Sequence, residues 1–101
     1  FQDGFYFRIW EYDAPIELPE EFHIITQDNI VYARSLYDRF LDELATLSYM
    51  HEYALVQKNF SKDSICDGNY YFKRTDKDNE NHRIYMFYDS IDHCVYELVV
   101  F

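Results

Sequence analysis

The chain has 101 residues, a formal net charge of −10 and 21% aromatic residues, among them eleven Tyr and nine Phe. This aromatic content excludes the disordered class, because highly charged chains stay unfolded only when they cannot bury enough apolar surface. The length fits a single domain over residues 1–101, and the acidic balance opposes direct binding to nucleic acid or to an anionic membrane.

The first segment with regular alternation is residues 5–12, which predict a strand. Phe5, Phe7 and Ile9 fall on one face, and the other face carries Tyr6, Arg8, Trp10 and Tyr12. Residues 13–27 predict a connector, because they contain both prolines of the chain and no alternation that lasts. A short extended piece is expected within the connector, over residues 22–25.

An amphipathic helix is predicted from Asp28, the expected N-cap, to about Ser48. Apolar residues recur at intervals of three and four and form a stripe, made of Ala33, Leu36, Tyr37, Phe40, Leu41, Leu44 and Leu47. The opposite side carries charged residues that can pair four positions apart, namely Arg34 with Asp38 and Arg39 with Glu43.

Residues 49–58 are compatible with two structures. They can form a second helix that turns Met50, Ala54 and Leu55 inward, or a strand through Tyr53, Leu55 and Gln57. A single straight helix over 28–58 would be about 45 Å long, which is too long for so small a domain. We therefore expect a break near residues 46–49.

The last third of the chain predicts three antiparallel strands, over residues 70–75, 82–88 and 93–101, joined by polar turns at 76–81 and 89–92. The final strand is apolar on both faces, which favours a central position. The predicted fold is therefore α+β: an N-terminal strand, one main helix and a three-stranded meander, with the helix on one face of the sheet.

The charge is concentrated in the first half of the chain. Residues 1–52 hold 11 acidic and 3 basic residues, and residues 53–101 hold 8 and 6. No Lys or Arg occurs between Ile9 and Ala33, where the acidic residues are Glu11, Asp13, Glu17, Glu20, Glu21 and Asp28. This stretch is either a solvated connector that keeps the protein soluble or a docking face for a basic protein surface. In the second case the aromatic anchors are Tyr12, Phe22, Tyr32 and Tyr37.

Patterns for other chemistry are weak. Asp76, Asp78 and Glu80 have the spacing that begins a calcium loop, but Asn81 replaces the required glycine, so a polar turn is the better interpretation. The four histidines show no zinc spacing, and no phosphate-binding glycine loop occurs. We therefore expect no catalytic residues, no metal and no cofactor. Two cysteines, Cys66 and Cys94, favour free thiols and a cytoplasmic location, with one disulfide as the alternative.

These features predict a non-enzymatic acidic module that binds another protein. Its most concrete form is an inhibitor or immunity-type protein, such as a phage- or mobile-element antagonist that occupies a nucleic-acid-binding surface as a mimic of nucleic acid. The alternatives are an interaction domain excised from a larger protein and a small-ligand-binding domain. The composition leaves the oligomeric state and the identity of the partner open.

Overall fold

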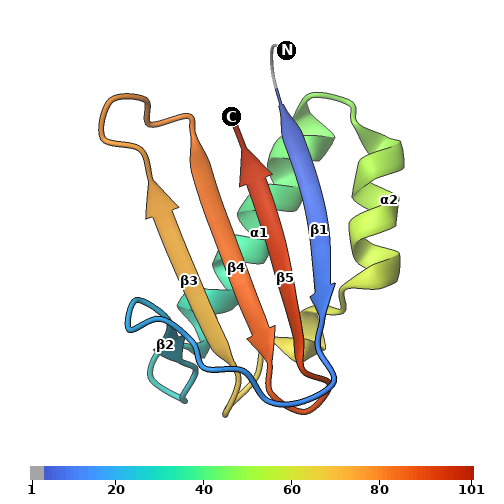
Figure 1. Cartoon of the computed structure of the whole chain (residues 1–101). Helices are drawn as coiled ribbons and strands as arrows, with labels where there is room; N and C mark the ends of the chain where they lie inside the picture. Colours follow the sequence, from blue (N-terminus) through green and yellow to red (C-terminus); the bar gives the residue numbers. More distant parts are fainter. Residues whose placement is uncertain (1–3) are drawn as a thin grey trace.

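The computed structural model describes residues 4–101, which form one five-stranded antiparallel sheet with helices behind it (Figure 1). The strands follow the order β1-β5-β4-β3-β2 across the sheet. The elements in chain order are β1 (Phe5–Glu11), β2 (His23–Ile24), α1 (Ile30–Thr46), α2 (Met50–Asn59), a 3-10 turn (Lys62–Ser64), β3 (Tyr70–Thr75), β4 (Arg83–Asp89) and β5 (Cys94–Val100).

The sheet is larger than the predicted three-stranded meander. β1 joins it by pairing antiparallel with β5, with Phe5 opposite Val100 and Glu11 opposite Cys94. β2 adds a two-residue strand on the other side, against β3. The pairing of β1 was missed because it joins opposite ends of the chain, and no local pattern specifies such a partner. The predicted central position of the last strand is confirmed, because β5 lies between β1 and β4.

One face of the sheet forms the core with α1. The alternation predicted for β1 holds, and its Ile9 lies in a cross-strand row with Tyr96, Phe87 and Tyr71. Rows of this kind stabilise a sheet through contacts between neighbouring side chains. The predicted helical stripe faces these rows, and all its members are buried except Leu47, which is 50% exposed. Leu47 lies beyond the end of α1, where the chain turns through Ser48 with a positive φ of 65°.

The local interactions of α1 differ from those predicted. The helix begins at Ile30 with Asn29 as its N-cap, so the assignment of Asp28 was wrong. Asn29 accepts a hydrogen bond from the Thr26 amide at 2.8 Å and donates one to the Ile24 carbonyl at 3.0 Å. Neither predicted charge pair forms. An exposed pair of this kind stabilises a helix by only about 0.2–0.5 kcal/mol, so contacts with residues from other elements can replace it. The observed partners are Ile65 for Arg34, Lys62 for Asp38 and Arg83 for Glu43.

Residues 50–59 form a helix, and the expected break lies before it. The residues predicted to turn inward do not do so: Met50, Ala54 and Leu55 are exposed, and Val56 is the buried residue of α2. The prediction failed because α2 packs beside α1 rather than continuing its stripe, so a different side of the helix is covered. No helix within residues 4–101 has both the length and the apolar character needed to cross a bilayer.

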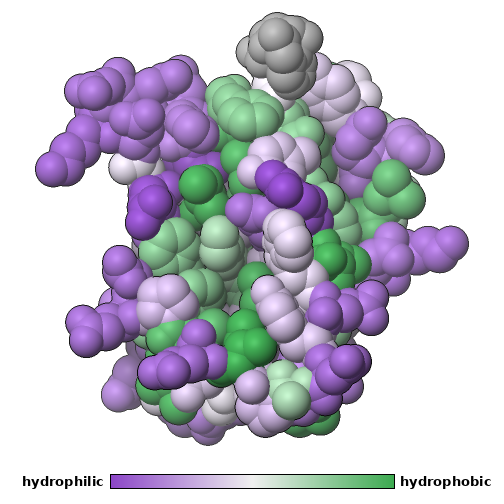
Figure 2. Space-filling view, in the orientation of Figure 1, coloured by the Kyte–Doolittle hydropathy of each residue, from purple (hydrophilic) through white to green (hydrophobic). Residues whose placement is uncertain are grey.

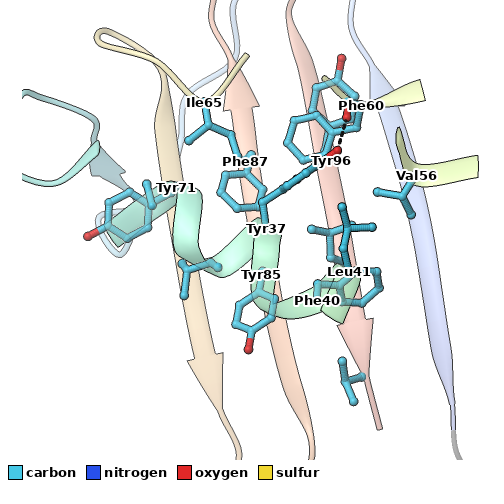
Figure 3. Packing of buried hydrophobic residues seen from close by; sticks show 14 of the residues in the cluster. Tyr37, Phe40, Leu41, Val56, Phe60, Ile65, Tyr71, Tyr85, Phe87 and Tyr96 are labelled. Carbon is cyan, nitrogen blue, oxygen red and sulfur yellow. Dashed lines mark hydrogen bonds between the residues drawn. The ribbon is translucent and has the colours of Figure 1, made fainter. Parts of the chain in front are cut away.

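An aromatic joint connects the helices to the sheet (Figure 3). Phe60, the residue that ends α2, stacks on Tyr96 of β5 with ring centroids 4.1 Å apart and planes at 6°. Tyr37 of α1 meets the Phe60 ring edge-on at 5.1 Å and donates a hydrogen bond from its hydroxyl to the Phe60 carbonyl at 2.8 Å. Phe60 therefore fixes the end of α2 against both α1 and the centre of the sheet.

We expect truncation of the stripe to destabilise the protein strongly. Phe40→Ala removes a buried ring that packs against Phe5, and such a change typically costs about 3–5 kcal/mol. Val31→Ala, on the same helix but 79% exposed, should shift the free energy of unfolding by no more than about 0.5 kcal/mol. Urea unfolding of both variants measures the difference. Equal stability of the two would show that the stripe is not part of the core.

Candidate binding surface at the acidic end of the sheet

The connector crosses the end of the sheet where β1 stops and β5 begins (Figure 1). It is held at several points. The Tyr12 amide donates to the His93 carbonyl at 3.0 Å, and the Ile16 amide contacts the Tyr88 hydroxyl at 3.5 Å. Farther along, Phe22 stacks on Phe72 of β3 with centroids 5.3 Å apart. The acidic connector is therefore attached along the sheet end and does not form a free loop.

Two other segments bring carboxylates to the same end. The loop before β3 and the turn between β4 and β5 meet there, because Asn69 accepts hydrogen bonds from the amide and the hydroxyl of Ser90 at 2.9 and 2.8 Å. We call the exposed carboxylates of these three segments, together with Glu11 at the end of β1, the acidic end; they are Glu11, Asp13, Glu17, Glu20, Glu21, Asp67 and Asp92. The three segments contain no Lys or Arg, and no member of the acidic end forms an ion pair within residues 4–101.

Buried polar groups hold this end in shape. Asp89 is buried, and its Oδ1 accepts hydrogen bonds from the amides of Ile91 and Asp92 at 2.9 and 3.3 Å, which closes the β4–β5 turn. Asn69 is buried too and donates to the Ser64 carbonyl at 2.7 Å. These contacts satisfy the polar groups that burial would otherwise penalise. The carboxylates of Asp67 and Asp92 are thus presented from a fixed backbone.

The predicted aromatic anchors have different environments. Tyr12 is exposed beside the β4–β5 turn, and Tyr32 is exposed on α1 with its ring edge-on to Tyr71 at 5.9 Å. Phe22 is half-buried by its stacking on the sheet, so it holds the connector rather than offering a free anchor. Tyr37 is buried in the core, and its assignment as an anchor was wrong.

Other members of the predicted set lie apart, and some useful residues were missed. Asp28 is exposed in the turn between β2 and α1, so it belongs to none of the segments that make up the acidic end. Ile91, at the tip of that turn, is 79% exposed and was not predicted, nor were Asp67 and Asp92. One sequence feature could have identified Asp92: no Lys or Arg follows Arg83, so the β4–β5 turn, like the connector, contains acidic residues and no basic ones.

The centre of the sheet face opposite α1 is mixed, with hydrophobic residues next to hydrophilic ones, and its margins are hydrophilic (Figure 2). Arg8 is the one basic residue of β1, and its side chain already has partners on this face. Its guanidinium lies 4.4 Å from the Tyr6 ring centroid and 5.6 Å from that of Trp10. The Arg8 Nε is also 3.4 Å from a carboxylate oxygen of Glu97, which is 9% exposed. Arg8 therefore compensates a buried carboxylate and does not offer a free basic site.

The negative field of the acidic end reaches the nearest thiol. Burial, followed by the charges of Glu11, Asp92 and Asp89, raises the pKa of the Cys94 thiol above its ordinary value. Burial and the same neighbourhood raise the pKa of Tyr96 to about 12. Both shifts have the sign expected when carboxylates disfavour a second negative charge. Both Cys66 and Cys94 are free.

Other clues to chemistry are sparse. Asp76 accepts a hydrogen bond from the Asp78 amide at 2.9 Å and pairs with His82 at 3.5 Å, which closes the β3–β4 turn. Within residues 4–101 no three His, Cys, Asp or Glu side chains gather closely enough to hold a metal ion. Comparisons with protein-family models, with curated proteins and with solved structures give no match for this chain.

Cys94 should report the charge of the acidic end. In a Cys66→Ser background, Glu11→Gln or Asp92→Asn removes a carboxylate that disfavours the thiolate, so the Cys94 pKa should fall. Alkylation by iodoacetamide, a neutral reagent, should then be faster at mildly alkaline pH. Glu80→Gln removes the same charge in the β3–β4 turn, at the other end of the sheet, and should leave the rate unchanged. Equal acceleration by all three variants would contradict a local field.

Proposed function

We propose that this chain is a non-enzymatic protein-binding module whose acidic end docks on a basic surface of another protein. One observation carries the proposal: the end of β1 and three connecting segments far apart in the sequence present seven exposed carboxylates at one end of the sheet, with no Lys or Arg in those segments. Complementary charge of this kind raises the association rate and excludes wrong partners. Tyr12 and Ile91, exposed at the same end, supply apolar contact area that charge alone does not give.

The attachment of the connector supports docking over simple solvation. Charge that serves only solubility is effective when it is dispersed over the surface. Here the charge is concentrated, and the backbone that carries it is held by Phe22 on Phe72 and by Tyr12 on His93. A fixed arrangement loses little conformational entropy on binding, which favours affinity.

The most concrete form of the proposal is an antagonist of a nucleic-acid-binding protein, of the kind that phages and mobile elements encode. Carboxylates on a fixed scaffold can take the positions that phosphates occupy on such a partner, whose surface is basic because it must neutralise phosphates. The same carboxylates repel nucleic acid, so the chain itself is expected to bind neither DNA nor RNA.

Charge reversal at the acidic end should slow association. The variant Glu17→Lys, Glu20→Lys, Glu21→Lys changes the formal net charge from −10 to −4, and no member of this set forms an ion pair within residues 4–101 that the fold would lose. A protein captured by the wild-type chain should associate more slowly with this variant, and wild-type binding should weaken as salt is raised through about 0.15 M. Surface plasmon resonance gives both rates.

A matched variant separates local from overall charge. Asp42→Lys, Asp78→Lys, Glu80→Lys makes the same change in net charge on α1 and on the β3–β4 turn, and the side chains of all three residues are exposed. It should associate nearly as fast as the wild type, apart from a small long-range effect. If both triple variants associate at the same reduced rate, or neither is slowed, the acidic end is not the docking surface.

The aromatic anchor should act after encounter. Tyr12→Ala removes an exposed ring whose backbone, not side chain, holds the connector to His93. We therefore expect unchanged thermal stability, an unchanged association rate and dissociation faster by about tenfold or more. Tyr32→Ala, at the far corner beside β2, serves as the comparison. Faster dissociation for Tyr32→Ala alone would move the docking surface to that corner.

A further inference from the structure

The outer edge of β1 is an unpaired strand edge. β1 is the last strand on its side of the sheet, and its partner β5 occupies only the inner side. Gly4 and Phe101 exchange two backbone hydrogen bonds, and the Tyr12 amide donates to His93. In an antiparallel pair the bonded positions alternate, so the residues between them direct their N–H and C=O groups away from β5. The outward groups belong to Phe5, Phe7, Ile9 and Glu11.

This edge lacks several of the features that normally protect one. Natural edge strands are often short or bulged, carry Lys, Pro or other charged side chains, or are covered by a helix or loop, because an exposed row of amides is a template for another strand. β1 has seven residues, no Pro, no Lys and a regular register with β5 from end to end. The opposite side of the sheet is finished by β2, which has only two residues.

An apolar groove runs along the same edge. α2 lies beside β1, on the side of the sheet where no further strand follows (Figure 1). The groove between β1, α2 and α1 has a volume of about 150 Å³, and Glu52 is its one charged lining residue. The other lining residues are Phe5, Tyr6 and Phe7 of β1, Phe40 and Leu44 of α1, and Leu55 and Val56 of α2. An apolar cavity of about 150 Å³ can hold one benzene molecule, so this groove can take one large apolar side chain.

The edge and the groove are in register with each other. A strand added beside β1 would lie about 4.8 Å farther out, over α2. In an antiparallel pair, the residue opposite Phe7 points to the same face as Phe7, which is the face that lines the groove. The residue opposite Ile9 would cover a side chain that is 37% exposed. The residue opposite Glu11 would meet a carboxylate that has no ion pair within residues 4–101.

We propose that the outer edge of β1 and the groove beside α2 bind an extended segment of a partner protein by strand addition, antiparallel to β1. The segment carries a basic residue opposite Glu11 and apolar residues opposite Ile9 and Phe7. Strand addition of this kind takes its affinity from main-chain hydrogen bonds and its specificity from pockets for alternate side chains. This inference goes beyond the proposed function, because it adds a second contact surface that can be tested on its own.

Charge decides between a foreign strand and a second copy of this chain. Glu11 ends the edge and Glu52 is the one charged residue among those that line the groove. Each copy also carries a formal net charge of −10, so two copies repel each other. Pairing of β1 with itself would offer Glu11 no lysine, because the one cation in the strand, Arg8, is engaged with Glu97 on the other face. The complementary occupant is therefore a basic, alternately apolar segment.

The test uses a capped seven-residue peptide with lysine first, threonine at the even positions, and valine, leucine and valine at the third, fifth and seventh. Aligned antiparallel, its odd residues face Glu11, Ile9, Phe7 and Phe5 in turn. We expect the fluorescein-labelled peptide to bind, as measured by anisotropy. N-methylation at the third and fifth residues removes two of the N–H groups that donate to β1 and should weaken binding by about tenfold or more. N-methylation at the fourth and sixth should leave it unchanged, and glutamate in place of lysine should weaken it.

Variants of the protein locate the peptide. Leu55→Lys places a charge in the groove at a residue that is 42% exposed, so the fold should be retained, and peptide binding should fall by about tenfold or more. Val31→Lys makes the same change at an exposed residue of α1, outside the groove, and should bind as the wild type. Far-UV circular dichroism and the melting temperature check the fold of both.

Three results would overturn the inference: no binding of the unmethylated peptide, equal binding of the two methylated peptides, or binding that Leu55→Lys does not weaken. A dimer in sedimentation velocity that Leu55→Lys dissolves would also overturn it, because a second copy would then be the occupant. None of these measurements involves the Glu17, Glu20 and Glu21 variants. Strand addition and docking at the acidic end can therefore fail separately.

Discussion

The stacking of Phe60 on Tyr96 is the contact on which the arrangement of this small domain depends. α2 buries only one residue of its own, Val56, so its helix alone gives little apolar surface to hold it in place. The fully buried Phe60 ring at its end adds the missing contact, against Tyr96 in the interior strand β5 and Tyr37 in the main helix. Because Phe60 anchors α2 at one end, the rest of α2 lies beside β1, and the groove follows from that position.

The same aromatic packing separates the acidic surface from the core. Alternation along β1 and β5 directs one set of aromatic side chains toward α1. Most carboxylates lie outside the strands, and many of them are in the turns and the connector. Glu97 is the carboxylate that lies in the middle of a strand, on β5. Burial of a lone carboxylate would be costly, and Arg8 offsets that cost at 3.4 Å while its guanidinium lies over the rings of Tyr6 and Trp10.

Sequence reasoning succeeded where the pattern was local. The alternation of residues 5–12 gave β1 with its faces assigned correctly, and the spacing of Leu36, Phe40 and Leu44 gave the buried side of α1. It failed where distant segments compete. The pairing of β1 with β5, the exchange of helical charge pairs for partners such as Lys62, and the inward side of α2 all depend on which elements become neighbours in space.

The candidate surface was predicted in part for the same reason. The acidic connector is continuous in the sequence and was identified from its lack of Lys and Arg, together with the exposed Tyr12. Asp67, Ile91 and Asp92 join it only because β3, β4 and β5 are antiparallel neighbours, which brings their connecting loops to one end. Tyr37 was predicted both as a member of the helical stripe and as an anchor, and its burial confirms the stripe and not the anchor; Tyr32 lies outside the stripe and is exposed.

Glu11 belongs to both surfaces, and its position couples them geometrically. It is the last residue of β1, with its main chain at the open edge, and it is also the first carboxylate of the acidic end. A strand that runs antiparallel to β1 begins beside Glu11, so the chain that precedes this strand passes over the acidic end. One partner segment of the proposed kind, basic first and alternately apolar afterwards, would therefore meet both surfaces in the order in which the fold presents them. Two weak contacts on one segment reinforce each other, because formation of the first raises the effective concentration of the second.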